Sequence, residues 1–318
     1  NNINNKKTLV TGGAGFIGSV LINKLLRVGR SIIVVDKLSL GTTSNLDLDE
    51  IDFYEEDINH YAKIIKLLEG IELDEVWHLA ANSDIQAGVT DLDIDLNDTF
   101  LTTSSVLKVM KAMGCTALNF ASSSAVYGIN NNRLYEDIGP MMPISNYGAM
   151  KLASEALINA SLESFLEKAC IYRFPNVTGA PATHGVILDF VRKLKNDRSV
   201  LHVLGNGSQQ KSYLHVHELV DAMLFINKNS QLGNNYFNIG PEDDGVTVRQ
   251  IAELTVSILA PEAEIKFGEK DRGWIGDVPK FFYSNDKLKK LGWKSEIHSI
   301  DAVKTAIKEI GFQEGFLN

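Results

Sequence analysis

The chain has 318 residues, of which 44% are hydrophobic and 22% charged, and a formal net charge of −9 at pH 7. This length predicts one large domain or two smaller ones that share an interface. The acidic balance, with no lysine- and arginine-rich block, disfavours a nucleic-acid partner. No apolar run approaches the roughly 20 residues that span a bilayer, and the polar start lacks a signal peptide's apolar centre, so we expect no membrane partner and a cytoplasmic protein.

Short β-branched runs alternate with segments of helical periodicity through the first half of the chain. The predicted strands are residues 8–12, 31–36, 75–81, 117–123 and 169–174. The predicted helices are residues 15–28, 61–69, 94–113 and 147–167. This alternation is typical of βαβ units, which form a parallel sheet with helices on both faces, so the predicted fold class is α/β.

Beyond residue 176 the alternation loosens. The predicted helices are residues 186–196, 215–228, 247–259 and 299–310, and the predicted short strands lie near 200–204, 236–239 and 264–267. These elements fit a smaller α/β lobe, and we expect residues 236–240 to return to the main sheet. Because no low-complexity linker separates the two parts, we expect them to share a cleft.

The cysteines and histidines favour no metal site. Cys115 and Cys170 lie far apart in apolar surroundings and lack metal-ligand spacing. This pattern favours buried thiols in a reducing compartment over a disulfide or a metal. His215 and His217 are isolated from other ligand types, so we predict that the protein binds no metal.

A glycine-rich turn follows the first predicted strand. Gly13, Gly15 and Gly18 come between an apolar strand and a helix. Glycines here permit a tight turn, let backbone N–H groups approach a diphosphate, and let helix and strand pack closely, with the anion at the helix N-terminus. Asp36 ends the next strand, where a carboxylate accepts hydrogen bonds from a ribose diol and repels a 2′-phosphate. The pattern predicts a dinucleotide site that prefers NAD to NADP.

A second cluster combines a serine, a tyrosine and a lysine. Three serines follow the strand at 117–123, and Tyr147 and Lys151 come a short loop later. Residues four apart on a helix share one face. A neighbouring ammonium favours phenolate and so lowers the pKa of a tyrosine, which would make Tyr147 a usable base near neutral pH.

These segments resemble the extended short-chain dehydrogenase/reductases, specifically the nucleotide-sugar enzymes of the NAD-dependent epimerase/dehydratase family. The likeness runs through nearly the whole chain and rests on TGGAGFIGS (11–19), DKLSLG (36–41), EEDI (55–58), HLAA (78–81), SSSAVYG (122–128), YGAMK (147–151), RFPNVTG (173–179) and RGWIGDVP (272–279). It implies a Rossmann-type doubly wound parallel sheet with a smaller α/β substrate-binding lobe. It also implies NAD as cofactor and a nucleotide sugar as substrate.

The resemblance assigns roles to individual residues. Ser123 and Tyr147 would hydrogen-bond one sugar hydroxyl, Tyr147 would take its proton, and Lys151 would keep the tyrosine acidic while hydride passes from C4 to NAD. The implied cofactor residues are Gly12, Gly15, Phe16, Ile17, Gly18, Asp36, Lys37, Ser39, Asp57, Ile58, Leu79, Ala80, Ala81, Asn97, Ser122, Tyr147, Lys151 and Pro175. The implied substrate residues are Ser123, Asn176, Lys211 and Arg272. Tyr127 is expected to pack rather than react.

Two residues after the catalytic serine limit which reactions the resemblance allows. Dehydratases of the family carry Asp-Glu immediately after the catalytic hydroxyl residue, whereas this chain has Ser124 and Ala125. The resemblance therefore favours 4-epimerisation, and several segments look most like the 4-epimerases assigned to UDP-glucose or UDP-galactose. A 4-dehydrogenase that releases the ketose, a less favoured 4,6-dehydratase, and a non-enzymatic NAD-binding regulatory protein stay open. Lys211 stands near a position where family epimerases usually carry arginine. Because of this difference, the resemblance does not assign the sugar or the nucleotide base of the substrate.

The resemblance also implies a division of labour and an assembly. Residues 1–176, with a return of residues 213–245, would bind NAD, and residues 177–318 would mainly bind the nucleotide sugar. The two long predicted helices carry more apolar or small residues than one sheet face needs: Ile94, Leu101, Val106, Leu107, Val109, Met110, Leu152, Ala156, Leu157, Ala160 and Leu166. Related epimerases pair such helices across a two-fold axis, so we expect a homodimer.

Overall fold

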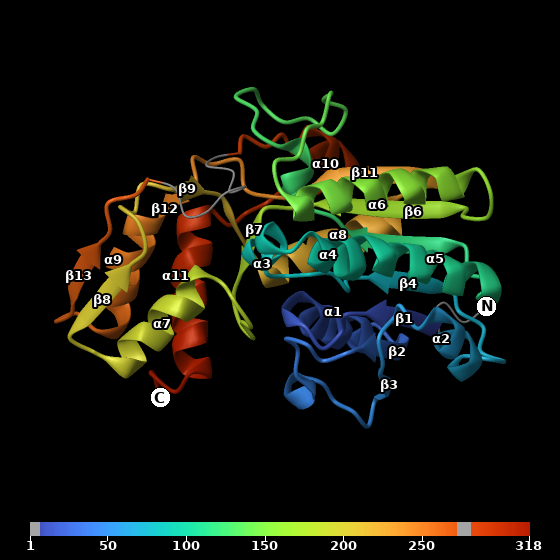
Figure 1. Cartoon of the computed structure of the whole chain (residues 1–318), viewed down its shortest axis with the longest axis horizontal. Coiled ribbons are helices and arrows are strands. Elements are labelled where there is room, and N and C mark those ends of the chain that lie inside the picture. Colours follow the sequence, from blue (N-terminus) through green and yellow to red (C-terminus); the bar gives the residue numbers. More distant parts are fainter. Residues whose placement is uncertain (1–6, 272–280) are drawn as a thin grey trace.

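A seven-stranded parallel sheet forms the centre of the molecule (Figure 1). The computed structural model describes residues 7–271 and 281–318. In spatial order the strands are β11 (Gly233–Asn238), β6 (Lys168–Arg173), β5 (Ala117–Ala121), β4 (Glu75–His78), β1 (Lys7–Thr11), β2 (Ser31–Asp36) and β3 (Ile51–Glu55). The order reverses between β1 and β4, which is the switch point at which doubly wound sheets bind ligands. The predicted fold class is confirmed.

Helices cover both faces of this sheet. One face packs against α1 (Phe16–Arg27) and α8 (Val216–Asn229). The other face packs against α2 (Tyr61–Leu67), α5 (Thr102–Met113) and α6 (Asn146–Leu162). Neighbouring residues Leu9 and Val10 of β1 are both fully buried, one in each core. A strand covered on both faces is apolar throughout, which is why the sequence shows runs rather than alternation.

The edge strand β3 was not among the predicted strands. Its side chains at Asp52 and Glu55 are exposed, while Ile51 is buried. Because an edge strand is partly open to solvent, its polar residues hide the apolar run that marks the central strands. At the opposite edge, β11 pairs with β6 in parallel, which confirms the expected return of residues 236–240 to the main sheet.

The helix predicted at 94–113 is interrupted. α4 (Leu92–Asp95) leads into a π-helical turn at Leu96–Leu101, and α5 follows. A π-helical turn has a wider hydrogen-bonding pattern than an α-helix, and such turns are frequent at functional sites. Asp95, the last residue of α4, is fully buried there, a placement that the simple helical repeat did not predict.

A smaller lobe with its own core lies at one end of the molecule (Figure 1). It consists of α7 (Val186–Asn196), α9 (Val248–Leu259) and α11 (Ser299–Gln313) around the paired strands β8 (Val200–Val203) and β13 (Glu264–Phe267). The remaining elements are α3 (Ile85–Thr90), α10 (Asp286–Leu291), and the strand pairs β7 (Asn176–Thr178) with β10 (Tyr213–His215) and β9 (Gln210–Lys211) with β12 (Val246–Thr247). No helix of the described residues is both long and apolar enough to cross a membrane.

Five of the eleven apolar or small residues expected at a dimer contact are buried inside the chain, and Ile94, Leu152 and Leu157 are half-buried. Val106, Leu107, Val109, Met110 and Leu166 are all buried in the core on the α5 and α6 face of the sheet. The outward-facing members of the set are Leu101, Ala156 and Ala160. The homodimer stays a prediction, with a smaller apolar surface to support it than the sequence indicated.

Candidate active site

The loops that follow the parallel strands open onto one edge of the sheet. Parallel strands place their carboxyl ends together, and ligands of open α/β sheets bind at that edge. Six predicted residues stand at such strand ends: Gly12 after β1, Asp36 ending β2, Asp57 after β3, Leu79 after β4, Ser122 after β5 and Pro175 after β6. The fold therefore gathers residues from most of the first half of the chain at one place.

Gly12, in the turn between β1 and α1, and Gly18, in the first part of α1, leave no room for a side chain. Gly12 has a φ of +69°, and a Cβ there would lie 2.7 Å from the backbone nitrogen of Ala80. A Cβ on Gly18 would lie 2.4 Å from the carbonyl oxygen of Gly12. Gly15 is the N-cap of α1, and within the described chain no side chain caps this helix and no acidic residue occupies its first turn. An uncapped helix N-terminus binds anions, so these residues fit the diphosphate of NAD.

Asp36 connects this turn to the loop after β2. Its carboxylate accepts one hydrogen bond from the Ala14 N–H (2.9 Å) and one from the Leu38 N–H (2.8 Å). A carboxylate has about four acceptor positions, so lone pairs remain for the hydroxyls of an adenosine ribose. Asp36 therefore has a structural task, to hold the glycine-rich turn, besides the cofactor contact that the sequence predicted.

Three further predicted cofactor residues lie side by side. The Lys37 ammonium is 2.7 Å from a carboxylate oxygen of Asp98 and 3.9 Å from one of Asp57. The Asn59 side chain donates to the backbone carbonyl of Asn97 (2.9 Å), which joins the loop after β3 to the π-helical turn. Lys37 is thus matched by two carboxylates, so it adds little net positive charge beside Asp36 that could favour a 2′-phosphate.

The remaining predicted cofactor residues differ in exposure. Ser39 is exposed, and Ile17 and Ala81 are half-buried. Phe16 and Ile58 have side chains buried in the two cores of the sheet. Any contact that Phe16 and Ile58 make with a cofactor is therefore left to their backbone atoms.

The beginning of α6 brings the three predicted catalytic residues together. Ser145 caps this helix by accepting a hydrogen bond from the Gly148 N–H (3.0 Å). The hydroxyl of Ser123, which follows β5, lies near Tyr147 and favours its phenolate form. The Lys151 ammonium lies 5.7 Å from the centre of the Tyr147 ring and donates to the carbonyl of Ala121 (2.6 Å). The spacing in the sequence thus corresponds to a real cluster.

The pKa of Tyr147 shifts in the opposite direction from the prediction. Burial raises the pKa of Tyr147 to about 12, against an opposing hydrogen bond from Ser123. Burial also lowers the pKa of Lys151 to about 7, although Glu155 and Asp95 oppose this shift. The prediction that Lys151 makes Tyr147 acidic is wrong for the chain by itself, because desolvation disfavours the charged form of both groups.

A buried ion pair that the sequence did not reveal lies behind the catalytic lysine. Arg173, at the end of β6, is 2.6 Å from the carboxylate of Glu155, one turn after Lys151 on α6. Ser122 donates its hydroxyl proton to the same carboxylate (2.5 Å), so only the acceptor positions of this hydroxyl remain for a cofactor. Arg173 also donates to the hydroxyl of Tyr127 (3.1 Å), which confirms that Tyr127 packs in the interior. The only signal in the sequence was the spacing of four between Lys151 and Glu155.

The predicted substrate residues lie toward the smaller lobe. Asn176 is exposed on β7, opposite Tyr213 of β10. Lys211, on β9 two residues before Tyr213, is half-buried. Lys211 is thus two residues from the partner of Asn176 in this strand pair, whereas Arg272 lies outside the described residues.

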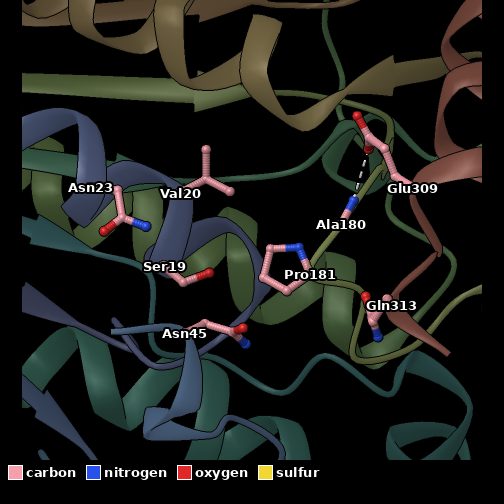
Figure 2. A pocket seen from close by; sticks show the side chains of 8 residues that line it. All are labelled: Ser19, Val20, Asn23, Asn45, Ala180, Pro181, Glu309 and Gln313. Carbon is pink, nitrogen blue, oxygen red and sulfur yellow. Dashed lines mark hydrogen bonds between the residues drawn. The ribbon is translucent and has the colours of Figure 1, made fainter. Parts of the chain in front are cut away.

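A pocket of about 410 Å³ lies where α1 meets the smaller lobe (Figure 2). Its lining residues are Ser19, Val20, Asn23, Asn45, Ala180, Pro181, Glu309 and Gln313. Glu309 accepts a hydrogen bond from the Ala180 N–H (3.1 Å), and its carboxylate lies 3.1 Å from the His215 ring. It therefore joins α11 to the end of β10 and to the loop after β7. This pocket contains none of the predicted catalytic residues. Among the described residues, no group of three or more His, Cys, Asp or Glu side chains could hold a metal.

Comparison with known proteins places the chain in a family. The model of the NAD dependent epimerase/dehydratase family matches residues 8–240. The UDP-glucose 4-epimerase of Lacticaseibacillus casei is 26% identical over 314 residues, covering 92% of this chain and 93% of the relative. That of Corynebacterium glutamicum is 27% identical over 306 residues, covering 91% of each.

Solved structures agree with these relatives. A UDP-galactose 4-epimerase has 33% identity and a TM-score of 0.85, covering 96% of this chain and 99% of its own. The UDP-glucose 4-epimerase of Thermus thermophilus in complex with NAD has 26% identity and a TM-score of 0.83, covering 96% and 98%. Together with the uncapped helix behind the glycine-rich turn, these likenesses identify the chain as an NAD-dependent enzyme of the epimerase/dehydratase family.

Proposed function

We propose that this chain is a nucleotide-sugar 4-epimerase whose substrate is a UDP-hexose of the glucose and galactose type. The observation that carries the proposal is the cluster of Ser123, Tyr147 and Lys151 at the carboxyl edge of the sheet, the same edge at which the glycine-rich turn follows β1. The relatives named UDP-glucose and UDP-galactose 4-epimerases support the substrate class. Ser124 and Ala125 provide no carboxylate for dehydration.

The mechanism assigns each catalytic residue a task. NAD, held by the glycine-rich turn and Asp36, would accept a hydride from C4 of the sugar and would bring a positive charge on its nicotinamide ring. Ser123 orients the C4 hydroxyl, and the Tyr147 oxygen takes and returns its proton. A positive charge nearby opposes the effect of burial on Tyr147, so the phenol becomes a better base in the complex than in the free chain. In the free chain, burial lowers the pKa of Lys151 to about 7, so Lys151 can exchange a proton near neutral pH.

The two lobes would divide the work. We assign NAD binding to residues 1–176 with the return of residues 213–245, and nucleotide-sugar binding mainly to residues 177–318. The diphosphate would lie near Asn176 and Lys211, with Arg272 as a third contact. A lysine offers a point charge to a phosphate, whereas an arginine offers a bidentate fork.

A homodimer is part of the proposal. Two copies would meet along α6 and along α5 with the end of the π-helical turn before it, where Ala156, Ala160 and Leu101 are exposed. Two-fold contacts are the commonest oligomeric arrangement. Light scattering at micromolar concentration is expected to give twice the monomer mass, and a single monomeric mass would end this part of the proposal.

The function is tested by incubating the enzyme with UDP-, GDP- and dTDP-sugars. Products are followed by mass spectrometry and NMR, and the cofactor by its absorbance. The expected result is interconversion of UDP-glucose and UDP-galactose without net formation of NADH. Released ketose with equivalent NADH would identify a 4-dehydrogenase instead, and loss of water would identify a dehydratase. Bound NAD with no product from any sugar would favour a regulatory protein.

A further inference from the structure

Asp95 is a buried carboxylate with an incomplete set of partners. It is 0% exposed at the junction of α4 and the π-helical turn. Its Oδ1 accepts hydrogen bonds from the Asn82 side chain (3.1 Å) and the Thr99 hydroxyl (3.0 Å). Its Oδ2 has no hydrogen-bond partner among the described residues. Burying such a group is costly unless a charge nearby compensates for it.

The surrounding backbone is built to hold this carboxylate. A Cβ on Gly88 of α3 would lie 1.8 Å from Oδ2, so only glycine leaves room for it. The carbonyl of Gly88 accepts a hydrogen bond from the side chain of Asn146 (2.8 Å), the residue before Tyr147. The carbonyl of Thr99 accepts one from Ser154 (3.4 Å), three residues after Lys151. Hydrogen bonds thus join both ends of the catalytic segment of α6 to the elements that surround Asp95, namely α3 and the π-helical turn.

The ionisable groups around Asp95 are few. Tyr147 and Lys151 interact with it electrostatically from α6, and Asp98 does so from the π-helical turn. The segment of α3, residues 85–90, contains no ionisable side chain. Burial raises the pKa of Asp95, and the Lys151 charge opposes that shift.

Lys151 has two acidic neighbours, and only one of them is otherwise neutralised. Glu155 is already paired with Arg173 at 2.6 Å. Asp95 has no such cation in the described chain, so the Lys151 ammonium is the positive charge that compensates for it. A negative charge favours the protonated form of each neighbour, and the Asp95 charge acts in this direction on both Tyr147 and Lys151.

We propose that Asp95 is a positioning residue of this active site: held by Asn82 and Thr99 against Gly88, its carboxylate is the counter-charge of Lys151 and sets the pH range in which Lys151 and Tyr147 work. The inference rests on the proposed catalytic roles of these two residues. Without the Asp95 charge, both groups lose their protons at lower pH. The acid limb and the alkaline limb of the pH–rate profile then move in the same direction.

The first test is the pH dependence of turnover in Asp95→Asn. Asparagine keeps the shape and a hydrogen-bonding oxygen but removes the charge. We expect both limbs of the profile to move to lower pH by about one unit, the usual effect of one nearby charge. The matched control is Asp93→Asn, which makes the same change at an exposed residue of α4 and is expected to leave the profile unchanged. A lower rate at every pH with unmoved limbs would show a purely structural role and overturn the proposal.

The second test does not depend on turnover or cofactor. In protein labelled with ¹³C at the lysine Cε, Lys151 is expected to titrate near pH 7, and its resonance is assigned by its loss in Lys151→Met. In Asp95→Asn this titration should move to lower pH, whereas in the matched control Asp93→Asn it should stay where it is. An unmoved Lys151 titration would overturn the proposal even if activity falls. If no sugar is epimerised but the titration moves, the proposed function fails and the role of Asp95 stands.

Discussion

The turn after β1 and the first half of α6 meet at the same edge of the sheet, but different physical effects shape them. At the turn, steric room determines which residues fit: a Cβ on Gly18, at the start of α1, would lie 2.4 Å from the carbonyl oxygen of Gly12 in the turn. In α6, the electrostatic environment determines how the side chains ionise: Lys151 is 3% exposed, and burial lowers its pKa to about 7. A residue with a steric task is recognisable from its type alone. A residue with an electrostatic task takes its properties from its neighbours.

The largest effect is expected at Tyr147 in α6. A change there should lower turnover and leave the stability of the protein unchanged. Tyr147→Phe removes the oxygen that moves the proton, so turnover should fall by about 10²–10⁴-fold, the usual contribution of a positioned acid–base group. Its Tm and NAD affinity should stay close to those of the parent. Ser123→Ala should cost less, because serine orients the hydroxyl without taking the charge.

Tyr127→Phe is the control for Tyr147→Phe. The Tyr127 hydroxyl is buried and donates to Asn238 (2.6 Å), so its removal should lower stability by about 1 kcal/mol and leave turnover nearly unchanged. Steady-state kinetics and thermal unfolding measure both variants. Near-normal turnover of Tyr147→Phe on the true substrate would remove Tyr147 from the mechanism.

The next effect concerns stability in the charged region. Glu155→Gln leaves the buried Arg173 without its counter-charge, and breaking a buried ion pair in this way costs about 3–5 kcal/mol. The free energy of unfolding in urea measures the loss. Glu163→Gln changes the same residue type at the exposed end of α6 and should alter stability by less than about 0.5 kcal/mol. Equal stabilities of the two variants would contradict the importance of the pair.

A smaller loss of stability is expected to distinguish Gly15, the N-cap of α1, from Gly18 within that helix. A Cβ on Gly18 would force backbone atoms apart, so Gly18→Ala should destabilise the protein by about 1–3 kcal/mol, as overpacking does. A Cβ on Gly15 would meet its nearest atom at 3.3 Å, which a small adjustment relieves. Gly15→Ala should therefore keep a near-normal Tm but weaken NAD binding at the helix N-terminus. Thermal unfolding and NAD titration test this, and the reverse pattern would exchange the two roles.

The smallest effect is expected at Asp36. Asp36→Asn removes the charge that attracts the ribose diol and repels a 2′-phosphate, so NAD should bind about tenfold more weakly and the preference over NADP should narrow. Asp52→Asn, on the exposed part of the neighbouring strand, is the control and should bind NAD like the parent. Fluorescence titration with both cofactors gives the ratio. If the parent already binds NADP as tightly as NAD, this interpretation of Asp36 is wrong.

Several features could be predicted from the sequence because their causes are local. The alternation of apolar runs and helical periodicity predicted the central strands, and the spacing of four predicted that Tyr147 and Lys151 share a face. The acidic segment at 91–98 was less informative. Its four aspartates look like a solvated surface, yet Asp95 is buried while Asp93 is exposed.

By itself, the sequence determined the α/β fold with helices on both faces of a parallel sheet, the glycine-rich turn and the shared helix face of Tyr147 and Lys151, while the resemblance to a family added the doubly wound arrangement and the choice of Ser123. Glycine conformation, helical spacing and strand-end position act over a few residues, so a single sequence shows them. Only the tertiary structure decided the direction of the Tyr147 pKa shift, the pairing of Glu155 with Arg173 and the burial of Asp95. These depend on desolvation and on charges from segments far apart in the chain, which meet only when the sheet and its helices are assembled.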